Sequence, residues 1–96
     1  MTAISINHVE KRATAMGEPR AFIAGTRVRV QDIVADHERH GLTPEQIARE
    51  YSHISQAQIH AALAYYFDHR QEIQRQMLED EQYIASVNRE RKADEL

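Results

Sequence analysis

The chain has 96 residues, of which 42% are apolar and none is cysteine, and its net charge is −3. This length allows one domain with a modest core, and the lack of cysteine excludes a disulfide framework and a thiolate zinc site. The charge is unfavourable for binding nucleic acid. However, residues 1–67 carry seven basic and seven acidic side chains, so the whole deficit lies in residues 68–96. Any DNA-binding surface is therefore expected in the first two thirds of the chain.

Residues 20–30 are expected to form a β-hairpin, because they alternate in character on both sides of Gly25-Thr26, a dipeptide typical of a type II′ turn. In this register Phe22 lies opposite Arg29, so one face of the hairpin is basic and the other packs into the core. Residues 4–9 also alternate, which indicates a third strand that pairs either with this hairpin or with a second chain.

Two segments of the sequence have nearly the same helix-start pattern. The segments Thr43-Pro-Glu-Gln46 and Ser55-Gln-Ala-Gln58 are capping boxes, each flanked by apolar residues that are placed to form a hydrophobic staple. They predict a short helix over residues 44–51 and a longer helix over residues 56–67. The inner face of the longer helix is expected to comprise Ile59, Ala62, Leu63 and Tyr66.

The remaining helices are predicted from periodicity. One helix starts at Gln31 and ends before Gly41, a residue typical of a left-handed C-cap. A break is expected at residues 67–69, followed by an amphipathic helix that frays over residues 88–96. Its sparse apolar stripe consists of Ile73, Met77, Ile84 and Val87.

The predicted fold is mainly α, with an N-terminal β-hairpin, a three-helix core and a C-terminal amphipathic helix. Residues 1–16 form an N-terminal segment, residues 17–75 form a hairpin and helix-turn-helix domain, and residues 76–96 form a charged helix or tail.

The helices over residues 44–51 and 56–67 have the dimensions of a helix-turn-helix motif, whose second helix offers its first turns to base edges in the major groove. Capped helix N-termini also hold phosphates. The candidate DNA-contacting residues are Thr43, Ser55, Gln56, Gln58, His60, Ala61, Arg27 and Arg29. Two other interpretations stay open, because Gln58 is a member of its own capping box and the two arginines could merely solvate an exposed sheet face.

Three stretches resemble a known family: Gly17-Glu-Pro-Arg-Ala-Phe-Ile-Ala-Gly-Thr-Arg-Val-Arg-Val30, Gly41-Leu-Thr-Pro-Glu-Gln-Ile47 with Tyr51, and Ile59-His-Ala-Ala-Leu-Ala-Tyr-Tyr66. The family comprises short prokaryotic proteins of unknown function that are grouped with VapB-type antitoxins. The resemblance covers about residues 17–75. It implies a homeodomain-like three-helix core and genetic pairing with a PIN-domain ribonuclease toxin. Arg29 and Ser52 replace residues that are commonly proline in the family, which leaves the expected fold intact.

The first hypothesis is an antitoxin that binds its own promoter and occludes a toxin nuclease with residues 73–96. We expect a homodimer, because the hairpin leaves an edge strand and a neutral DNA-binding portion needs two copies to gain affinity. A sparse amphipathic stripe can lie in a groove, and a basic side chain can enter an acidic active site. The candidate partner-binding residues are Met77, Ile84, Val87, Arg89, Arg91 and Lys92. The alternative is a dimeric protein-interaction module that never binds DNA.

Catalytic and metal-binding patterns are weak in this sequence. His37 and His40 lie one helical turn apart, but no further ligand completes a metal site around them. The sequence has no nucleophile elbow and no glycine-rich phosphate loop. Residues 1–9 lack the features of a signal peptide, and no apolar run approaches the roughly 20 residues that span a bilayer. We therefore expect a cytoplasmic protein that is not an enzyme and has no cofactor, no metal and no membrane partner.

Overall fold

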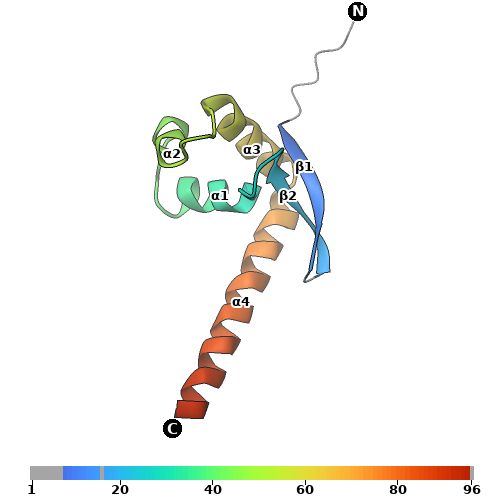
Figure 1. Cartoon of the computed structure of the whole chain (residues 1–96), viewed down its shortest axis with the longest axis vertical. Helices are drawn as coiled ribbons and strands as arrows, with labels where there is room; N and C mark the ends of the chain where they lie inside the picture. The colour runs from blue at the N-terminus through green and yellow to red at the C-terminus, as the bar shows by residue number, and fades with distance from the viewer. Residues whose placement is uncertain (1–7, 16, 96) are drawn as a thin grey trace, which may run out of the picture.

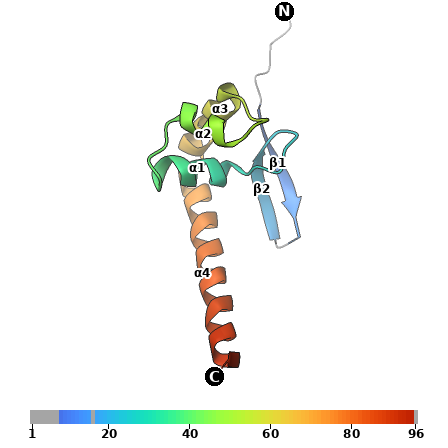
Figure 2. The same cartoon turned by 60° about the vertical axis from the view of Figure 1, so that its left-hand side comes forward.

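The computed structural model describes residues 8–15 and 17–95, which form a two-stranded hairpin followed by four helices (Figure 1). The elements are β1 (Val9–Thr14), β2 (Gly17–Ile23), α1 (Val30–Glu38), α2 (Pro44–Glu50), α3 (Gln56–Asp68) and α4 (Arg70–Glu95). The predicted mainly helical class with an N-terminal hairpin is confirmed. The hairpin and α1 to α3 make up what we call the head, from which α4 projects alone (Figures 1 and 2).

The hairpin lies one strand earlier in the chain than predicted. β1 pairs antiparallel with β2, and the turn between them falls near Ala15 instead of at Gly25. Of the predicted pairing across Gly25, the isolated bridge between Phe22 and Arg29 remains, in the predicted register. The expected second strand is absent because Val30 is buried in the core as the first residue of α1. The strand predicted over residues 4–9 lies mostly outside the described residues.

One hydrophobic core joins the head to the start of α4. The face predicted for α3 is confirmed, since its four buried residues are Ile59, Ala62, Leu63 and Tyr66. They pack with buried apolar residues from β2, α1 and α2, from the turn that follows α2, and from α4. These are Ala21, Ile23, Val30, Ile33, Val34, Ile47, Ile54 and Ile73.

The predicted break between the last two helices is confirmed at His69, whose backbone N–H donates to the carbonyl oxygens of Tyr65 and Tyr66, both at 3.0 Å. The helix that follows is longer than expected, because residues 88–95 continue α4 instead of fraying. At a rise of about 1.5 Å per residue, α4 is about 39 Å long. None of the described helices is long and apolar enough to cross a membrane.

The first half of α4 is fixed to the head by apolar contacts and by ion pairs. Ile73 and Gln76 are buried, and Met77 packs against the core. Lys11 on β1 pairs with Glu72 at 2.6 Å, and Arg39 on α1 pairs with Glu81. Two more pairs join β2 to α4: Glu18 with Arg75 and Arg20 with Asp80. Beyond Glu81, the described side chains of α4 make no hydrogen bond or ion pair with the head.

Candidate nucleic-acid interface

The starts of α2 and α3 are each held by a pair of reciprocal capping bonds. At the start of α2, Gln46 N–H donates to Thr43 Oγ1 at 3.2 Å, and Thr43 N–H donates to Gln46 Oε1 at 2.9 Å. At the start of α3, the equivalent bonds between Ser55 and Gln58 measure 3.2 and 2.7 Å. These bonds use the oxygen atoms of Thr43, Ser55 and Gln58, so the side chains of these residues are already engaged within the chain.

The exposed N-terminal face of α3 is formed by Gln56 and His60. Both side chains are exposed, and neither makes a hydrogen bond or ion pair with any described residue. Ala61 is half-buried on the same turn. A free glutamine can make a bidentate pair with adenine, and an exposed imidazole can donate to or accept from a base edge. Gln56 and His60 are therefore the predicted residues that are best placed to contact a groove.

Arg27 lies in the loop between β2 and α1, near the α2–α3 turn. The loop turns at Gly25, which has a φ of 75°, and Thr26 stabilises it by donating to the Ile23 carbonyl at 2.8 Å. Arg27 and His53, which belongs to the α2–α3 turn, line the same open hollow of about 730 Å³. The structure thus brings Arg27 beside the turn that leads into α3.

Arg29 does not join Arg27, although the sequence places both on one face. Its guanidinium pairs with Asp32 at 3.0 Å and lies 3.5 Å from Asp80, on the side of the head that faces α4. The reason is that residues 27–30 do not continue as a strand, so the predicted basic face is not formed. Arg29 therefore serves the junction between the head and α4.

Arg27 differs from the other lysines and arginines of the head in its ion pairing. In the described part of the head, every other lysine and arginine is in an ion pair with an acidic side chain. Arg89, Arg91 and Lys92 on α4 also have no partner among the described residues. Because an unpaired cation is free to meet an anionic partner, these four residues are the sites where such a partner would gain most.

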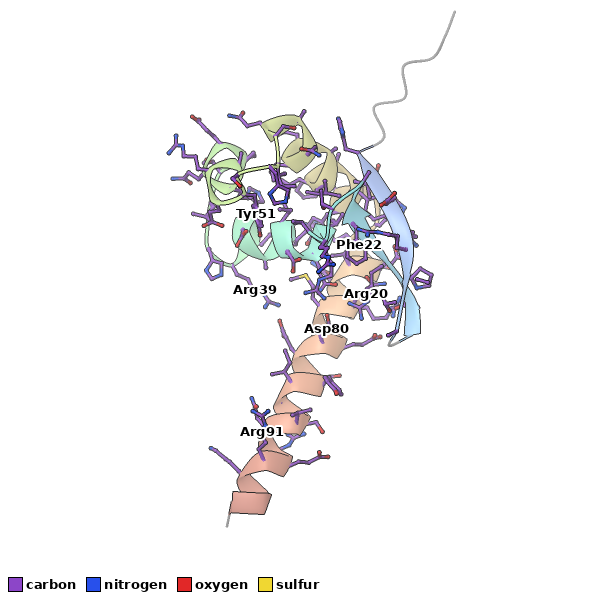
Figure 3. The ribbon with its side chains drawn as sticks, viewed as in Figure 1. Arg20, Phe22, Arg39, Tyr51, Asp80 and Arg91 are labelled. Carbon is purple, nitrogen blue, oxygen red and sulfur yellow. The ribbon has the colours of Figure 1, made fainter. Side chains whose placement is uncertain are left out.

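A polar cluster at the junction of the head and α4 was not predicted from the sequence. Arg20 makes a bidentate pair with Asp80, with two bonds of 3.0 Å, and Gln31 donates to the same carboxylate at 2.9 Å. Figure 3 shows Arg20 and Asp80 side by side where α4 leaves the head. One feature of the sequence could have indicated this cluster. Gln76 and Asp80 fall on the same helix face as the apolar stripe, and polar residues at such positions are typically paired with other polar groups.

The pKa values of one carboxyl group, that of Asp80, and of one phenol, that of Tyr51, are shifted by their surroundings. Burial alone would raise the pKa of Asp80, but hydrogen bonds from Gln31 and Arg20 outweigh it, so the pKa is lowered. Burial of Tyr51, followed by the charge of Asp36, raises the pKa of the Tyr51 phenol to about 12. The Tyr51 hydroxyl donates to Asp36 at 3.3 Å and so ties the end of α2 to α1.

The predicted partner-binding residues divide between two faces of α4. Met77 packs on the core, and Ile84 and Arg91 follow it on the same face at intervals of two turns. Val87 is close to this face, whereas Arg89 lies on the opposite side of the helix. Ile84 is 58% exposed, and Figure 3 shows Arg91 far along α4 from the head.

No group of three or more histidine, cysteine, aspartate or glutamate side chains is placed to hold a metal ion in the described part of the chain. The Nδ1 atom of His37 lies 2.9 Å from the Leu42 carbonyl oxygen, and among the described residues His37 makes no hydrogen bond with a carboxylate. His40 is exposed. The two histidines noted in the sequence therefore have no further ligand beside them among the described residues.

A family model described as "Protein of unknown function (DUF433)" matches residues 13–66. The match begins near the end of β1 and ends at Tyr66 in α3, so it covers β2, α1, α2 and most of α3 and leaves out α4. No curated protein and no solved structure matches the chain.

Proposed function

Because the chain belongs to the family described as "Protein of unknown function (DUF433)", which carries no assigned activity, we propose its function from the geometry of the head. We propose that it is a DNA-binding regulator in which α2 and α3 act as a helix-turn-helix. In this proposal α1 to α3 form a homeodomain-like core, and the first two turns of α3 enter the major groove. The carrying observation is that Gln56 and His60 are exposed and uncommitted at the start of α3.

Charge supports a division of labour between base contacts and phosphate contacts. Arg27 is unpaired and lies beside the turn that leads into α3, so it would contact the DNA backbone. The capped N-terminus of α3 presents backbone N–H groups ahead of Gln58 that can hold a phosphate without further cations. With so few phosphate contacts a single head would bind weakly, and we therefore propose that two copies bind a two-fold site.

We further propose that the protein is an antitoxin whose partner is a toxin nuclease. The support is the family resemblance, together with the unpaired Arg89 and Lys92 on the distal part of α4, outside the head. Cationic side chains of this kind suit the acidic, metal-binding active site of a nuclease. The test is to mix the purified chain with the product of the adjacent reading frame. Inhibition of ribonuclease activity that is lost on changing Arg89 and Lys92 to alanine is the expected result.

The DNA proposal is tested by a shift assay on the DNA upstream of the gene. Gln56→Ala with His60→Ala should weaken specific binding by about 10- to 100-fold, since one good base contact contributes about 1–3 kcal/mol. Gln71→Ala with His40→Ala is the matched control, because these are the same residue types in exposed positions away from α3. It should leave binding unchanged.

The salt dependence provides an independent measurement on the same DNA. Arg27→Ala should weaken binding to all sequences alike and reduce the slope of log K against log salt by about 1. If the unchanged protein binds the upstream DNA no better than unrelated DNA, the helix pair is an interaction module instead.

A further inference from the structure

The open hollow of about 730 Å³ on the head lies between the β2–α1 loop and the α2–α3 turn, which Figure 2 shows beside each other. Arg27 from the loop and His53 from the turn both line it, and both side chains are exposed. Neither makes a hydrogen bond or ion pair with any residue that the structure describes. The backbone N–H of Arg27 also has no partner among residues 8–15 and 17–95. Donors from two distant segments of the chain are therefore uncommitted at one hollow.

The backbone that carries these two side chains is held by short-range hydrogen bonds. In the loop, Thr26 Oγ1 accepts from the Val28 N–H at 3.1 Å, and these two residues flank the arginine. In the turn, the Ile54 N–H donates to the Tyr51 carbonyl oxygen at 3.2 Å and so encloses the histidine. A site whose backbone is already ordered loses less entropy when a ligand binds. The hollow is thus prepared for a ligand in a way that a pair of unrelated surface side chains is not.

The other charged residues that line the hollow, Arg12 and Asp32, are already compensated within the chain. The Asp32 carboxylate pairs with Arg29 at 3.0 Å, and the Arg12 guanidinium lies 3.2 Å from the Glu10 carboxylate. Among the lining residues, the positive charge of Arg27 is therefore the one without a counter-charge. An uncompensated guanidinium makes its strongest hydrogen bonds with an anion, so the hollow favours an anionic ligand.

We propose that the hollow is a phosphate-binding site in which Arg27 and His53 hold the same phosphate group. A guanidinium presents several donors in one plane, which matches the oxygen atoms of a phosphate, and the imidazole supplies a further donor from the second loop. The single charge of a phosphodiester equals the single uncompensated charge of the hollow. That this phosphate belongs to the DNA backbone, at the edge of the groove that α3 enters, rests on the proposed function, whereas the site itself does not.

The site is tested without DNA by adding inorganic phosphate to the full-length chain and recording its NMR spectrum. At constant pH and ionic strength, replacing chloride with phosphate should shift the Arg27 amide signal and the His53 ring signals along one saturable curve. The ring of His40, which is exposed and does not line the hollow, is the matched control and should not shift. His53→Ala should weaken the phosphate affinity measured at Arg27 by about three- to tenfold, because it removes one hydrogen bond. Shifts no larger than those of His40 would overturn the proposal.

A double-variant comparison on the DNA upstream of the gene tests whether the two residues hold one phosphate. Arg27→Ala and His53→Ala should each weaken binding by about three- to tenfold, for upstream and unrelated DNA alike. Because both groups act on the same phosphate, the double variant should lose less than the product of the two single losses, by a factor of about 2 or more. His40→Ala removes an exposed imidazole outside the hollow and should leave binding unchanged. Losses that multiply would assign the two residues to separate groups and overturn the proposal.

The two measurements separate this inference from the proposed function. Saturable phosphate shifts at Arg27 and His53 in a chain that binds no DNA would support the site and overturn the DNA proposal, with a free phosphate compound as the ligand. DNA binding that neither change weakens would overturn the site and leave the proposed function standing. Both side chains are exposed, so the variants should unfold at the same denaturant concentration as the unchanged chain, which circular dichroism checks.

Discussion

Several side chains in this protein make hydrogen bonds with backbone groups only a few residues away. Thr43 and Ser55 accept hydrogen bonds from the first turns of α2 and α3, and Gln58 returns a bond to the chain before α3. These bonds fix the residues at which the two helices begin. Their place in the candidate interface is therefore to hold the start of α3 in position, while Gln56 and His60 remain free.

The caps are expected to contribute measurably to stability. Thr43→Ala and Ser55→Ala should each lower the free energy of unfolding by about 1 kcal/mol, because each leaves a helix N–H without its partner. Denaturant unfolding followed by circular dichroism measures this. Ser52→Ala is the matched control, since Ser52 is exposed and makes no hydrogen bond with a described residue. A cap variant as stable as this control would show that water replaces the capping oxygen at no cost.

The raised pKa of the Tyr51 phenol predicts a loss of stability at alkaline pH. Its phenol has a pKa of about 12 in the folded chain, above the ordinary value of 10, so folding favours the neutral form. The resulting stabilisation is complete below pH 10 and is lost as the pH rises from about 10 to 12. The unfolding free energy should therefore fall less steeply over this range in Tyr51→Phe. Tyr83→Phe, at a position 58% exposed, should follow the unchanged protein.

At the scale of elements, α4 contains two segments with different roles. The first half is fixed to the head, because Ile73 is buried and Asp80 accepts from Arg20 and Gln31. The second half extends past the head. Met77 and Asp80 follow the boundary predicted at residue 76, and both contact the head.

Two truncations locate the boundary. A chain that ends at Gln76 loses the Asp80 carboxylate and leaves Arg20 without its ionic partner, which should destabilise the head by about 1–3 kcal/mol because the pair is only partly buried. A chain that ends at Gln82 keeps this cluster and should unfold at nearly the same denaturant concentration as one copy of the full chain. Comparable stability of the two truncated chains would show that the cluster contributes nothing to the fold.

At the scale of the molecule, charge is distributed by element. Among the described residues, the lysines and arginines of the head are in ion pairs except for Arg27, and the unpaired cations of α4 lie towards its far end. A net charge of −3 therefore gives little information about where an anionic partner would bind. What matters is which cations have no internal partner, and this depends on pairs such as Arg20 with Asp80 and Arg39 with Glu81 that join distant parts of the chain.

The sequence by itself determined the features that depend on neighbours within a few residues. Both capping boxes, the break at His69 and the buried face of α3 are confirmed, because helix starts and helical periodicity are local properties. The uncommitted state of Gln56 could also be foreseen, since only Gln58 sits at the capping position. The bridge between Phe22 and Arg29 shows that even the register across Gly25 was encoded locally.

Tertiary structure decided which of two locally acceptable conformations residues 27–30 adopt. Val30 could extend a strand or begin a helix, and it begins α1 because the core formed by α1 and α3 buries it there. The same packing turned Arg29 towards Asp80 and left Arg27 free. Contacts between residues far apart in sequence have no local signature, since their energy appears only when the chain has folded.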